Sequence, residues 1–420
     1  MLTESGLFAK ALNVESPWYV SEVRFDPSGG RLDIFVDFER GSTFYYKDEE
    51  LGVEGHFKAY DTEEKVWRHL NFFQFECYLH AWVPRVDVGN GKVRRVKASW
   101  EGVSNGFTLL FEAFLLQLCR AMTPHQVGEM TGVSDQRLWS MLGSYVTIAR
   151  SEEDFESVFS ICLDETAARR GHDYVTIFAD SSGRRSIFVT QGKGAEAVAA
   201  FSRDLEAHGG KIENITQVSC DMSPAFIKGI TENFPEADIY FDRFHVMAVL
   251  QKGVDQVRRE EVQHNPILKK ARYAILKNKE NLTEKQAKKL EELKLSKLNL
   301  KTMRAMAIRE AFQQIYQAET PEQFEMLLKK WYFWATHSRL EPIIEAASTI
   351  RRHWYGIITW AKSKLNNGLM EGINSVFQAA KAKARGYKKT ETIITVIYLL
   401  TGKLDFSKVN PYCGATHTKS

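Results

Sequence analysis

The 420-residue sequence predicts an α+β multidomain protein, on three observations. Residues 17–100 alternate aromatic or β-branched residues with polar ones, which is typical of a small β-rich module. Residues 158–241 alternate short apolar runs with helical segments, which indicates an α/β domain with a mixed sheet. Residues 246–362 are charged, helical and without a convincing strand. The fold class is therefore a β-rich N-terminal module, a helix-turn-helix region and an α/β domain interrupted by an all-helical insertion.

The composition is that of an ordinary globular protein and does not identify a binding partner. Apolar residues make up 44% and charged residues 26% of the chain, as in ordinary globular proteins. A net charge of +3 is too small to indicate nucleic-acid binding by itself. The five cysteines are scattered without C-x-x-C spacing, which favours a reducing cytosol over a disulfide framework. The N-terminus resembles no signal peptide and no run of 18 apolar residues occurs, so we expect a cytosolic protein without a membrane partner.

Helical periodicity begins near residue 104 with FTLLFEAFLLQLCRAM. The following stretch, residues 123–146, predicts helix, turn and helix, with Thr123 and Ser134 as N-caps. In a DNA-binding helix-turn-helix, Ser134, Gln136 and Arg137 would begin the recognition helix and reach base edges. The alternative is a helical hairpin without a DNA role. In both cases we expect a core formed by Leu138, Trp139 and Leu142.

The next elements follow a specific order. FSICL, YVTIFA and SIFVT predict three strands, AEAVAAFSRDLEAHG a helix, ITQVSC a strand, PAFIKGITENF a helix and ADIYF a strand. The order β-β-β-α-β-α-β is the one expected of an RNase H-like domain. Beyond the insertion, NNGLMEGINSVFQAAKAKARGYKK begins at an Asn/Gly turn and continues as a helix that ends near Gly386.

These elements divide the chain into six predicted segments. They are the β-rich module (1–103), the helix-turn-helix region (104–150), the first part of the RNase H-like core (151–248), the all-helical insertion (249–362), the second part of that core (363–406) and a C-terminal tail (407–420).

Three carboxylates are candidates for a metal site. Asp164 immediately follows the strand FSICL and Asp221 immediately follows ITQVSC, so both are expected at the carboxyl ends of neighbouring strands, where α/β sheets place ligands. Glu371 lies on the helix after the insertion and would pack across the same edge. Such a triad suits two Mg²⁺ ions about 4 Å apart, with Mn²⁺ as a substitute, in phosphodiester chemistry. Taken singly, an Asp after a strand is more often a turn or cap residue; Asp173 and Asp180 are interpreted in that way.

Long segments of the chain, between residues 60 and 406, resemble the bacterial DDE transposases of the ISL-three insertion-sequence family. They include WRHLNFFQFECYLHAWVPRV, LDETAARRGHDYVT, DMSPAFIKGITENFPEADIYFDRFHV and NNGLMEGINSVFQAAKAKARGYKK. The resemblance implies Asp164, Asp221 and Glu371 as the catalytic, metal-binding triad. Asp242 and His245 are similar to a D-x-x-H element in related transposases, with either a role in supporting the active site or the scissile DNA end, or a structural role for a buried His.

One region departs from the family pattern. Members commonly begin with a Cys-rich zinc-binding module, whereas residues 44–60 and the segment after Val86 contain no cysteine, and His56, His69 and His80 lack recognisable ligand spacing. We therefore predict no zinc. Either the module folds without metal, as its aromatic content would permit, or DNA-end recognition is impaired; the sequence is that of a diverged or a resequenced member.

A basic segment follows the predicted Glu371 helix. It contains Lys381, Lys383, Arg385, Lys388 and Lys389, and its place beside the proposed metal site favours binding of DNA phosphates over a merely solvated face. The Lys/Glu run at residues 277–301 is balanced in sign and predicts an exposed helical hairpin. Trp331, Trp334 and Trp354 are interpreted as core residues rather than base-stacking wedges.

The function predicted is that of a DNA transposase in the bacterial cytosol, associated with the nucleoid. It would cleave at the terminal inverted repeats of a mobile element and join the ends to target DNA, as a homodimer or larger assembly. One alternative is a catalytically silent, transposase-derived DNA-binding protein. Another is a structure-selective nuclease on the same fold.

Overall fold

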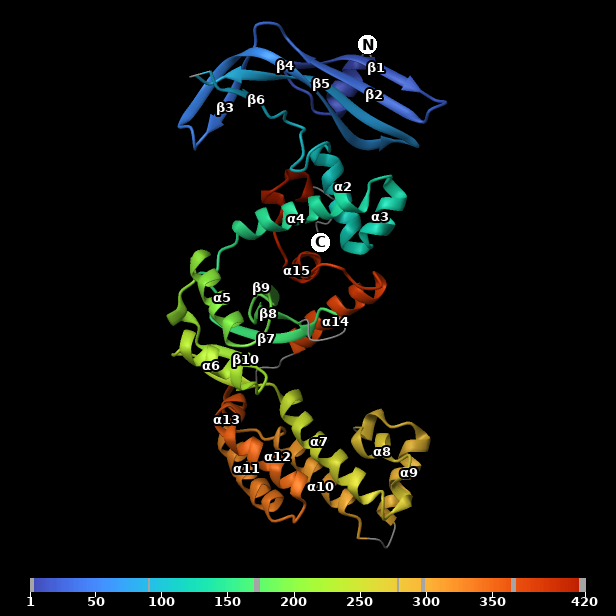
Figure 1. Cartoon of the computed structure of the whole chain (residues 1–420), viewed down its shortest axis with the longest axis vertical. Helices are drawn as coiled ribbons and strands as arrows, with labels where there is room; N and C mark the ends of the chain where they lie inside the picture. The colour runs from blue at the N-terminus through green and yellow to red at the C-terminus, as the bar shows by residue number, and fades with distance from the viewer. Residues whose placement is uncertain are drawn as a thin grey trace. The chain divides into compact units, whose positions relative to one another are not determined.

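The structure is a computed structural model that describes residues 4–89, 91–169, 174–277, 279–295, 299–363 and 368–414 (Figure 1). The chain forms two compact units. The first runs from the N-terminus to Glu153 and takes in the residues from Lys403 onward. The second spans Asp154–Gly402.

The first unit contains a six-stranded sheet in the region where the sequence predicts a β-rich module. Its strand order is β1-β2-β5-β4-β3, with β6 paired to β5. A cluster of aromatic rings packs on it, with the Trp18 ring centroid 5.1 Å from that of Trp100 and 5.7 Å from that of Phe44. The unit's apolar core therefore lies on this sheet. The elements are α1 (Glu4–Ala11), β1 (Trp18–Asp26), β2 (Arg31–Phe38), β3 (Thr43–Asp48), β4 (Val53–Phe72), β5 (Phe75–Asp87) and β6 (Val93–Arg95).

Three helices complete the first unit: α2 (Leu109–Ala121), α3 (Pro124–Thr131) and α4 (Asp135–Ser151). Thr123 caps α3 through a capping box, as predicted, and Gly132 ends that helix with φ at 72°. Ser134 occupies the N-cap position of α4, but its side chain makes no capping hydrogen bond. Leu138 is fully buried as expected, whereas Trp139 is only half-buried.

The chain returns to the first unit at its C-terminal end. Asn410 is fully buried, and its side-chain amide donates hydrogen bonds to the Leu109 carbonyl and the Tyr145 hydroxyl, both at 2.7 Å. The Tyr145 hydroxyl in turn donates to the Glu112 carboxylate at 2.8 Å. This buried network joins residues from α2, α4 and the segment between η4 (Phe406–Lys408) and η5 (Pro411–Gly414).

The second unit is built on a five-stranded sheet in the order β11-β10-β7-β8-β9. β7, β8 and β9 pair antiparallel, while β10 pairs parallel to both β7 and β11. All five predicted strands and both intervening helices are confirmed. Their bounds are β7 (Ser160–Ala167), β8 (Tyr174–Asp180), β9 (Arg185–Gln191), α5 (Ala195–Ala207), β10 (Gln217–Cys220), α6 (Pro224–Asn233) and β11 (Asp238–Phe241).

Helices pack against both faces of this sheet. Neighbouring residues of a strand point to opposite faces. On β9, Ile187 joins the apolar cluster that contains Phe201 of α5, while the Ser186 hydroxyl lies 2.8 Å from the Thr401 hydroxyl. Thr401 belongs to α15 (Thr390–Thr401), and α14 (Gly368–Lys383) contacts both α15 and β7. One face therefore carries α5, and the other carries α14 and α15.

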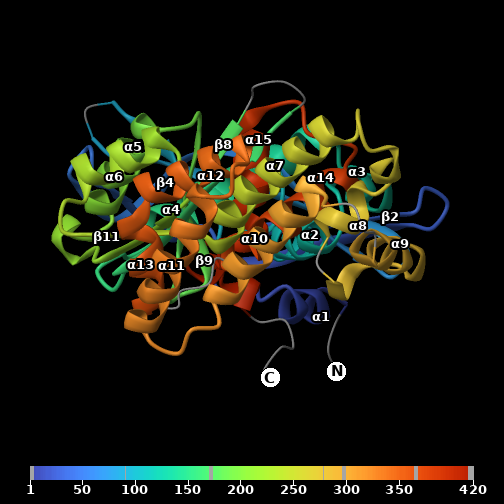
Figure 2. The ribbon, with the colours of Figure 1, turned by 90° about the horizontal axis from the view of Figure 1, so that it is seen from below.

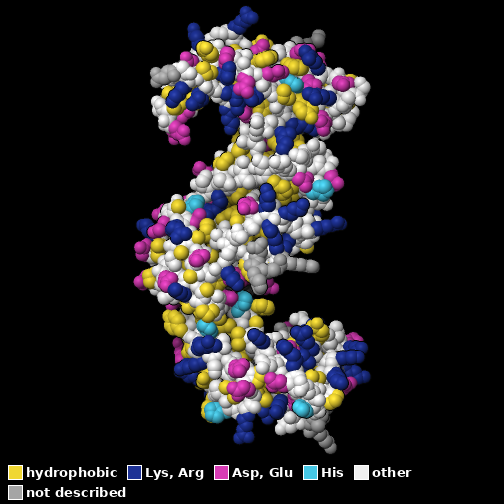
Figure 3. All heavy atoms as spheres, in the orientation of Figure 1, with side chains coloured by type: hydrophobic (Ala, Val, Ile, Leu, Met, Phe, Trp, Pro, Cys, Tyr) yellow, Lys and Arg dark blue, Asp and Glu magenta, His cyan; other side chains and the backbone are white. Residues whose placement is uncertain are grey.

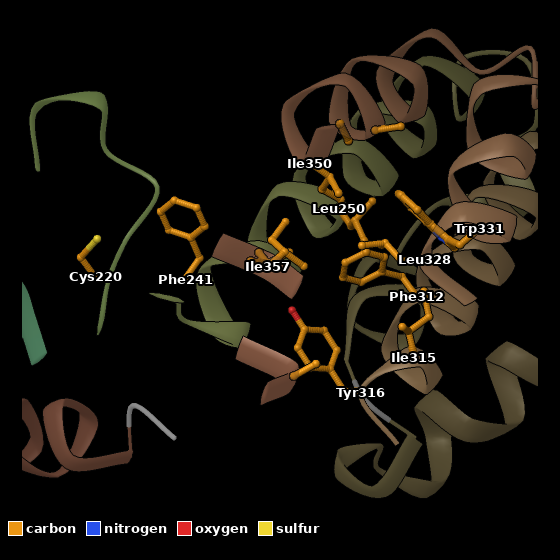
Figure 4. Packing of buried hydrophobic residues seen from close by; sticks show 14 of the residues in the cluster. Cys220, Phe241, Leu250, Phe312, Ile315, Tyr316, Leu328, Trp331, Ile350 and Ile357 are labelled. Carbon is orange, nitrogen blue, oxygen red and sulfur yellow. The ribbon is translucent and has the colours of Figure 1, made fainter. Parts of the chain in front are cut away.

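The described residues from Arg243 to Ser363, where the sequence predicts an all-helical insertion, contain helices and no strand (Figures 1 and 2). Long helix α7 packs against α10 and α12, and Figure 4 shows Leu250, Phe312 and Trp331 converging in the core between them. This core is continuous with the apolar cluster of the sheet. The helices are α7 (Arg243–Glu261), α8 (Arg272–Leu276), α9 (Glu284–Leu295), α10 (Lys301–Ile315), α11 (Pro321–Thr336), α12 (Glu341–Arg352) and α13 (Trp354–Ser363).

The predictions for the insertion are partly wrong. The Lys/Glu run was expected to be an exposed hairpin; most described side chains of α9 are exposed, but Leu290 and Leu293 are buried in the core. α9 is therefore an amphipathic helix. Of the three tryptophans expected in the core, Trp331 is buried and Trp354 is partly buried, but Trp334 is 45% exposed.

No described helix combines the length and the apolar character that a bilayer crossing requires.

Candidate carboxylate site and its cleft

Asp164 lies within strand β7, not after it as predicted. β7 continues to Ala167 because its pairing with β8 continues to that residue, with Asp164 opposite Ile177. On its other side, the ladder between β7 and β10 ends where Cys162 pairs with Ser219. The Asp164 backbone is thus paired on one side only.

Asp221 follows the last residue of β10, as predicted. Extending the register that pairs Ser219 with Cys162 places Asp221 opposite Asp164. Neighbouring strands lie about 4.8 Å apart. Ser219 and Asp221 also share a face of the sheet, because Val218 and Cys220 between them point into the α5 core. The Asp221 carboxylate accepts a hydrogen bond from the Ser223 backbone N–H at 2.9 Å.

Helix α14 carries Glu371 and lies along β7 through a row of polar contacts. The Asn374 side-chain amide donates to the Asp164 carboxylate at 2.8 Å, and the Gln378 amide donates to the Thr166 hydroxyl at 2.8 Å. One turn further, the Lys381 ammonium donates to the Ala167 carbonyl at 2.6 Å. Residues three or four apart share a helix face. Glu371 is three residues before Asn374 and lies on the same face as this row.

The electrostatics of Asp164 reflect its surroundings. Burial raises the pKa of the Asp164 carboxyl, and the negative charge of Asp221 raises it further. The Glu165 backbone N–H, the His245 ring and the Asn374 amide act in the opposite direction but do not cancel the rise. The pKa of Glu165 is raised as well, mainly by burial and additionally by the negative charge of Asp221. Two carboxylates on adjacent strands therefore repel each other here.

Asp242 and His245 stand at the start of α7. Asp242 is the N-cap, with its carboxylate accepting from the Phe244 backbone N–H at 3.2 Å. The His245 ring nitrogen Nε2 lies 4.0 Å from the Asp242 carboxylate, and its side chain is 31% exposed. His245 is therefore not a fully buried structural histidine.

A cleft of about 1180 Å³ opens in front of these residues. Asp164, Asp242, His245, Glu371 and Asn374 all line it, whereas Asp221 does not. Within the described ranges, no three His, Cys, Asp or Glu side chains lie close enough together to form a metal site. The structure thus gathers Asp164 and Glu371 in one cleft, with Asp221 beside Asp164, but not in a closed coordination sphere.

Asn374 is the residue that the sequence reasoning missed. Its amide nitrogen contacts Asp164, and its amide oxygen is buried without a hydrogen-bond partner. An oxygen acceptor left unpaired beside two repelling carboxylates suits a divalent cation or its bound water, since such cations prefer oxygen ligands. The signal that could have identified it was the helical spacing of Glu371, Asn374, Gln378 and Lys381.

The other predicted residues have varied surroundings. Arg385 follows α14 with φ at 56°, and the Lys388 carbonyl accepts a hydrogen bond from Arg169.

In the first unit Ser134 and Gln136 are exposed, whereas the Arg137 guanidinium stacks 3.9 Å from the Phe107 ring centroid. Asp180 caps a turn by accepting from the Ser182 N–H, as expected, and Asp173 falls outside the described residues.

Two histidines of the β-rich module, His69 and His80, have polar protein partners. His80 lies 2.6 Å from the Asp33 carboxylate, and His69 lies 2.8 Å from the Thr108 hydroxyl. The five cysteines have free thiols.

Sequence comparison places this chain within a known class of protein, the transposases. A family model described as "Transposase" matches residues 161–397, which is more than half of the chain and includes Asp164, Asp221 and Glu371. The chain belongs to that family, the DDE transposases of the ISL-three type.

Curated relatives agree with this assignment. The chain is 26% identical over 347 residues to the transposase for insertion sequence element IS1001 of Bordetella parapertussis, covering 80% of this chain and 84% of the relative. In an alignment that spans 428 positions, it is 24% identical to the transposase for insertion sequence element IS1557 of Mycobacterium tuberculosis, and the alignment covers 94% of each chain. The likeness therefore extends beyond the residues that the family model matches.

Proposed function

We propose that this transposase cleaves phosphodiester bonds at the ends of a mobile element and joins the freed 3′-hydroxyls to target DNA, using Asp164, Asp221 and Glu371. The observation that carries the proposal is the convergence of Asp164 and Glu371 on one cleft with Asp221 in register beside Asp164. The sheet order, with three antiparallel strands followed by two parallel ones, supports an RNase H-like catalytic domain.

Each carboxylate would present oxygen to divalent cations. Two Mg²⁺ ions, or Mn²⁺ in their place, would supply activation of the attacking oxygen and neutralisation of the leaving oxygen. Asp164 and Asp221, on adjacent strands, form the rigid side of the site. Glu371 is exposed on α14 and completes it from the helix. His245, at the mouth of the cleft, is positioned to contact the scissile DNA end.

DNA contacts outside the cleft follow from the same proposal. Exposed Ser134 and Gln136 begin helix α4 in the helix-turn-helix, while Arg137 is held against Phe107 and would have to leave that ring to reach a base. Lys381, Lys383, Arg385, Lys388 and Lys389 would bind phosphates beside the metal site. Because two DNA ends must be brought together, we propose a homodimer or larger assembly.

The purified protein is expected to nick a duplex that carries the element's terminal repeat, and to do so only with Mg²⁺ or Mn²⁺ present. The carboxylates alone cannot neutralise the charge that develops on the leaving oxygen, so EDTA should abolish product. The measurement is a gel assay on an end-labelled duplex, run beside a gel shift. Binding without nicking in either metal would support a catalytically silent DNA-binding protein. Equal cleavage of branched DNA of unrelated sequence would support a structure-selective nuclease.

Asn374 is proposed as a positioning residue between Glu371 and Asp164. Replacing it by alanine removes the hydrogen bond that orients the Asp164 carboxylate and the unpaired amide oxygen beside it. Changes of this kind around a metal site typically cost 10- to 100-fold in affinity or activity. We therefore expect Asn374→Ala to raise the Mg²⁺ concentration for half-maximal nicking at least about ten-fold.

Gln378→Ala is the matched control. It lies on the same face of α14, one turn on, and bonds to Thr166 rather than to a carboxylate. Its Mg²⁺ requirement should stay within about two-fold of the parent, a change worth only about 0.4 kcal/mol. Equal Mg²⁺ requirements for the two variants would show that Asn374 only attaches the helix to the strand.

A further inference from the structure

The cleft does not end at the carboxylates but continues along helix α7. Phe244, Ala248, Gln251, Asp255 and Arg259 all line it, at spacings of three or four residues that define one helix face. From Phe244 to Arg259 this face extends about 22 Å. That length is enough for several consecutive phosphates of a DNA strand. The groove therefore has the reach of a nucleic-acid strand.

The charge of the cleft changes sign along its length. Asp164, Asp242 and Glu371 line the end beside the sheet. Basic residues line the end within the helical insertion, from α7 and from α8 with its C-cap: Lys252, Arg259, Arg272 and Lys277. Figure 3 shows Lys and Arg side chains gathered over the region of α8 and α9.

The basic end keeps its positive charge. The carboxylate that lines it, Asp255, is buried and already bonded to the guanidinium groups of Arg258 and Arg259, with Arg272 at 3.7 Å. Lys252 is exposed. One buried carboxylate thus faces several cations, and the excess charge is of the sign that phosphates require.

Phe244 lines the cleft at the start of α7, next to the carboxylate end. It is the second residue of α7, directly between Arg243 and His245, and its side chain is 73% exposed although it lines the cleft. Its ring contacts the His245 ring edge-on, at 5.7 Å between centroids. The ring's remaining surface is open to a ligand that can cover it.

We infer that this groove binds an unpaired DNA strand, with its phosphates along the basic end and one base stacked on Phe244 next to the carboxylates. The inference rests on the proposed function for its biological setting. Every base has a face that stacks on an aromatic ring, and backbone phosphates pair with Lys and Arg without regard to sequence. In a duplex the base faces are covered by neighbouring pairs, so the exposed ring selects an unpaired base. Strand binding would place the adjoining phosphate at Asp164 and Glu371.

The first test measures binding of a fluorescein-labelled 12-nucleotide single strand to the full-length protein in EDTA, where no cleavage occurs. Phe244→Ala is expected to weaken binding roughly ten-fold, within the range known for base–aromatic stacking. A strand that contains 2-aminopurine should be quenched by the parent protein at one position and not by Phe244→Ala. The control is Phe333→Ala, which removes a 65% exposed ring on α11 outside the cleft. Affinity and quenching unchanged in Phe244→Ala would overturn the inference.

The second test uses salt. Each phosphate contact on a single strand contributes about 0.7 to the slope of log affinity against log salt concentration. Lys252→Ala should lower that slope by about 0.7. Lys330→Ala, which removes an exposed lysine from α11, should leave it unchanged. Equal slopes for the two variants would contradict a phosphate contact at Lys252.

These experiments separate the inference from the proposed function. Strand binding that depends on Phe244 and Lys252 is measured without metal and with a strand of arbitrary sequence. Nicking of terminal-repeat DNA is measured with metal. A protein that nicks but shows no Phe244-dependent stacking would refute only the strand groove, whereas one that stacks the strand but never nicks would refute only the proposed chemistry.

Discussion

Replacing Asp221 by asparagine is expected to lower metal-dependent nicking of terminal-repeat DNA at least about 1000-fold, which corresponds to about 4 kcal/mol of transition-state stabilisation. Asparagine keeps the oxygen that accepts from the Ser223 N–H, so the local turn should persist. It removes the charge that, in the proposed mechanism, holds a divalent cation beside Asp164. Asp164→Ala and Glu371→Ala are expected to abolish nicking as well, but Asp221→Asn changes the fewest contacts.

Asp180→Asn is the control for this substitution. Asp180 lies in the same sheet and also caps a turn, but it pairs with Ile161 and not with Asp164. Nicking by Asp180→Asn should stay within about two-fold of the parent, a change worth only about 0.4 kcal/mol. Full activity in Asp221→Asn would remove Asp221 from the proposed triad.

The same variant has a pH signature in metal-free protein. The pKa of Asp164 is raised in the folded state, so its contribution to stability is fully present below the ordinary Asp value of 3.8 and is lost as pH rises through the raised pKa. Asp221→Asn removes one of the causes of that rise. The loss of stability with rising pH should therefore be smaller in the variant, as measured by thermal unfolding in EDTA.

Trp331→Ala is expected to have the largest effect on stability. Trp331 is 3% exposed, its indole N–H donates to the Ile308 carbonyl at 2.8 Å, and its ring meets Phe312 at 4.6 Å between centroids (Figure 4). Removing a buried tryptophan leaves a cavity that costs about 3–5 kcal/mol. Urea unfolding followed by circular dichroism should show this loss.

Trp334→Ala, three residues further along the same helix, provides the comparison. Its side chain is 45% exposed, so we expect a loss of less than about 1 kcal/mol. Similar losses for the two variants would mean that α11 does not bury the face assigned to it.

Much of the second unit follows from local pattern. Apolar runs separated by helical segments predicted all five strands, because buried strands in a sheet covered on both faces read as continuous apolar runs. The same reasoning failed at Asp164. After FSICL the residues turn polar, which suggests a strand end, but pairing with β8 carries the strand on to Ala167. Pairing with a partner strand is a tertiary contact that a single strand's pattern cannot show.

The position of Asp221 could be predicted because the chain leaves the sheet there and Ser223 begins a helix, which the sequence marks with Pro224. The role of α14 was harder to see. Its contacts with β7 depend on Asn374 and Gln378. Asn and Gln side chains also occur commonly on solvent-exposed helix faces, so the sequence alone does not indicate these contacts. Trp334 was misplaced because the buried face of α11 follows Phe324, Leu328, Trp331 and Ala335, and Trp334 lies beside that row rather than in it.

Asn410 follows the whole of the second unit in the chain, yet its side chain belongs to the buried hydrogen-bond network of the first unit. A chain truncated between Gly402 and Asn410 would keep every residue of the proposed catalytic centre, but the Tyr145 hydroxyl and the Leu109 carbonyl would lose their buried amide partner. The core of the first unit is therefore completed by a residue that is translated after the whole of the proposed catalytic centre.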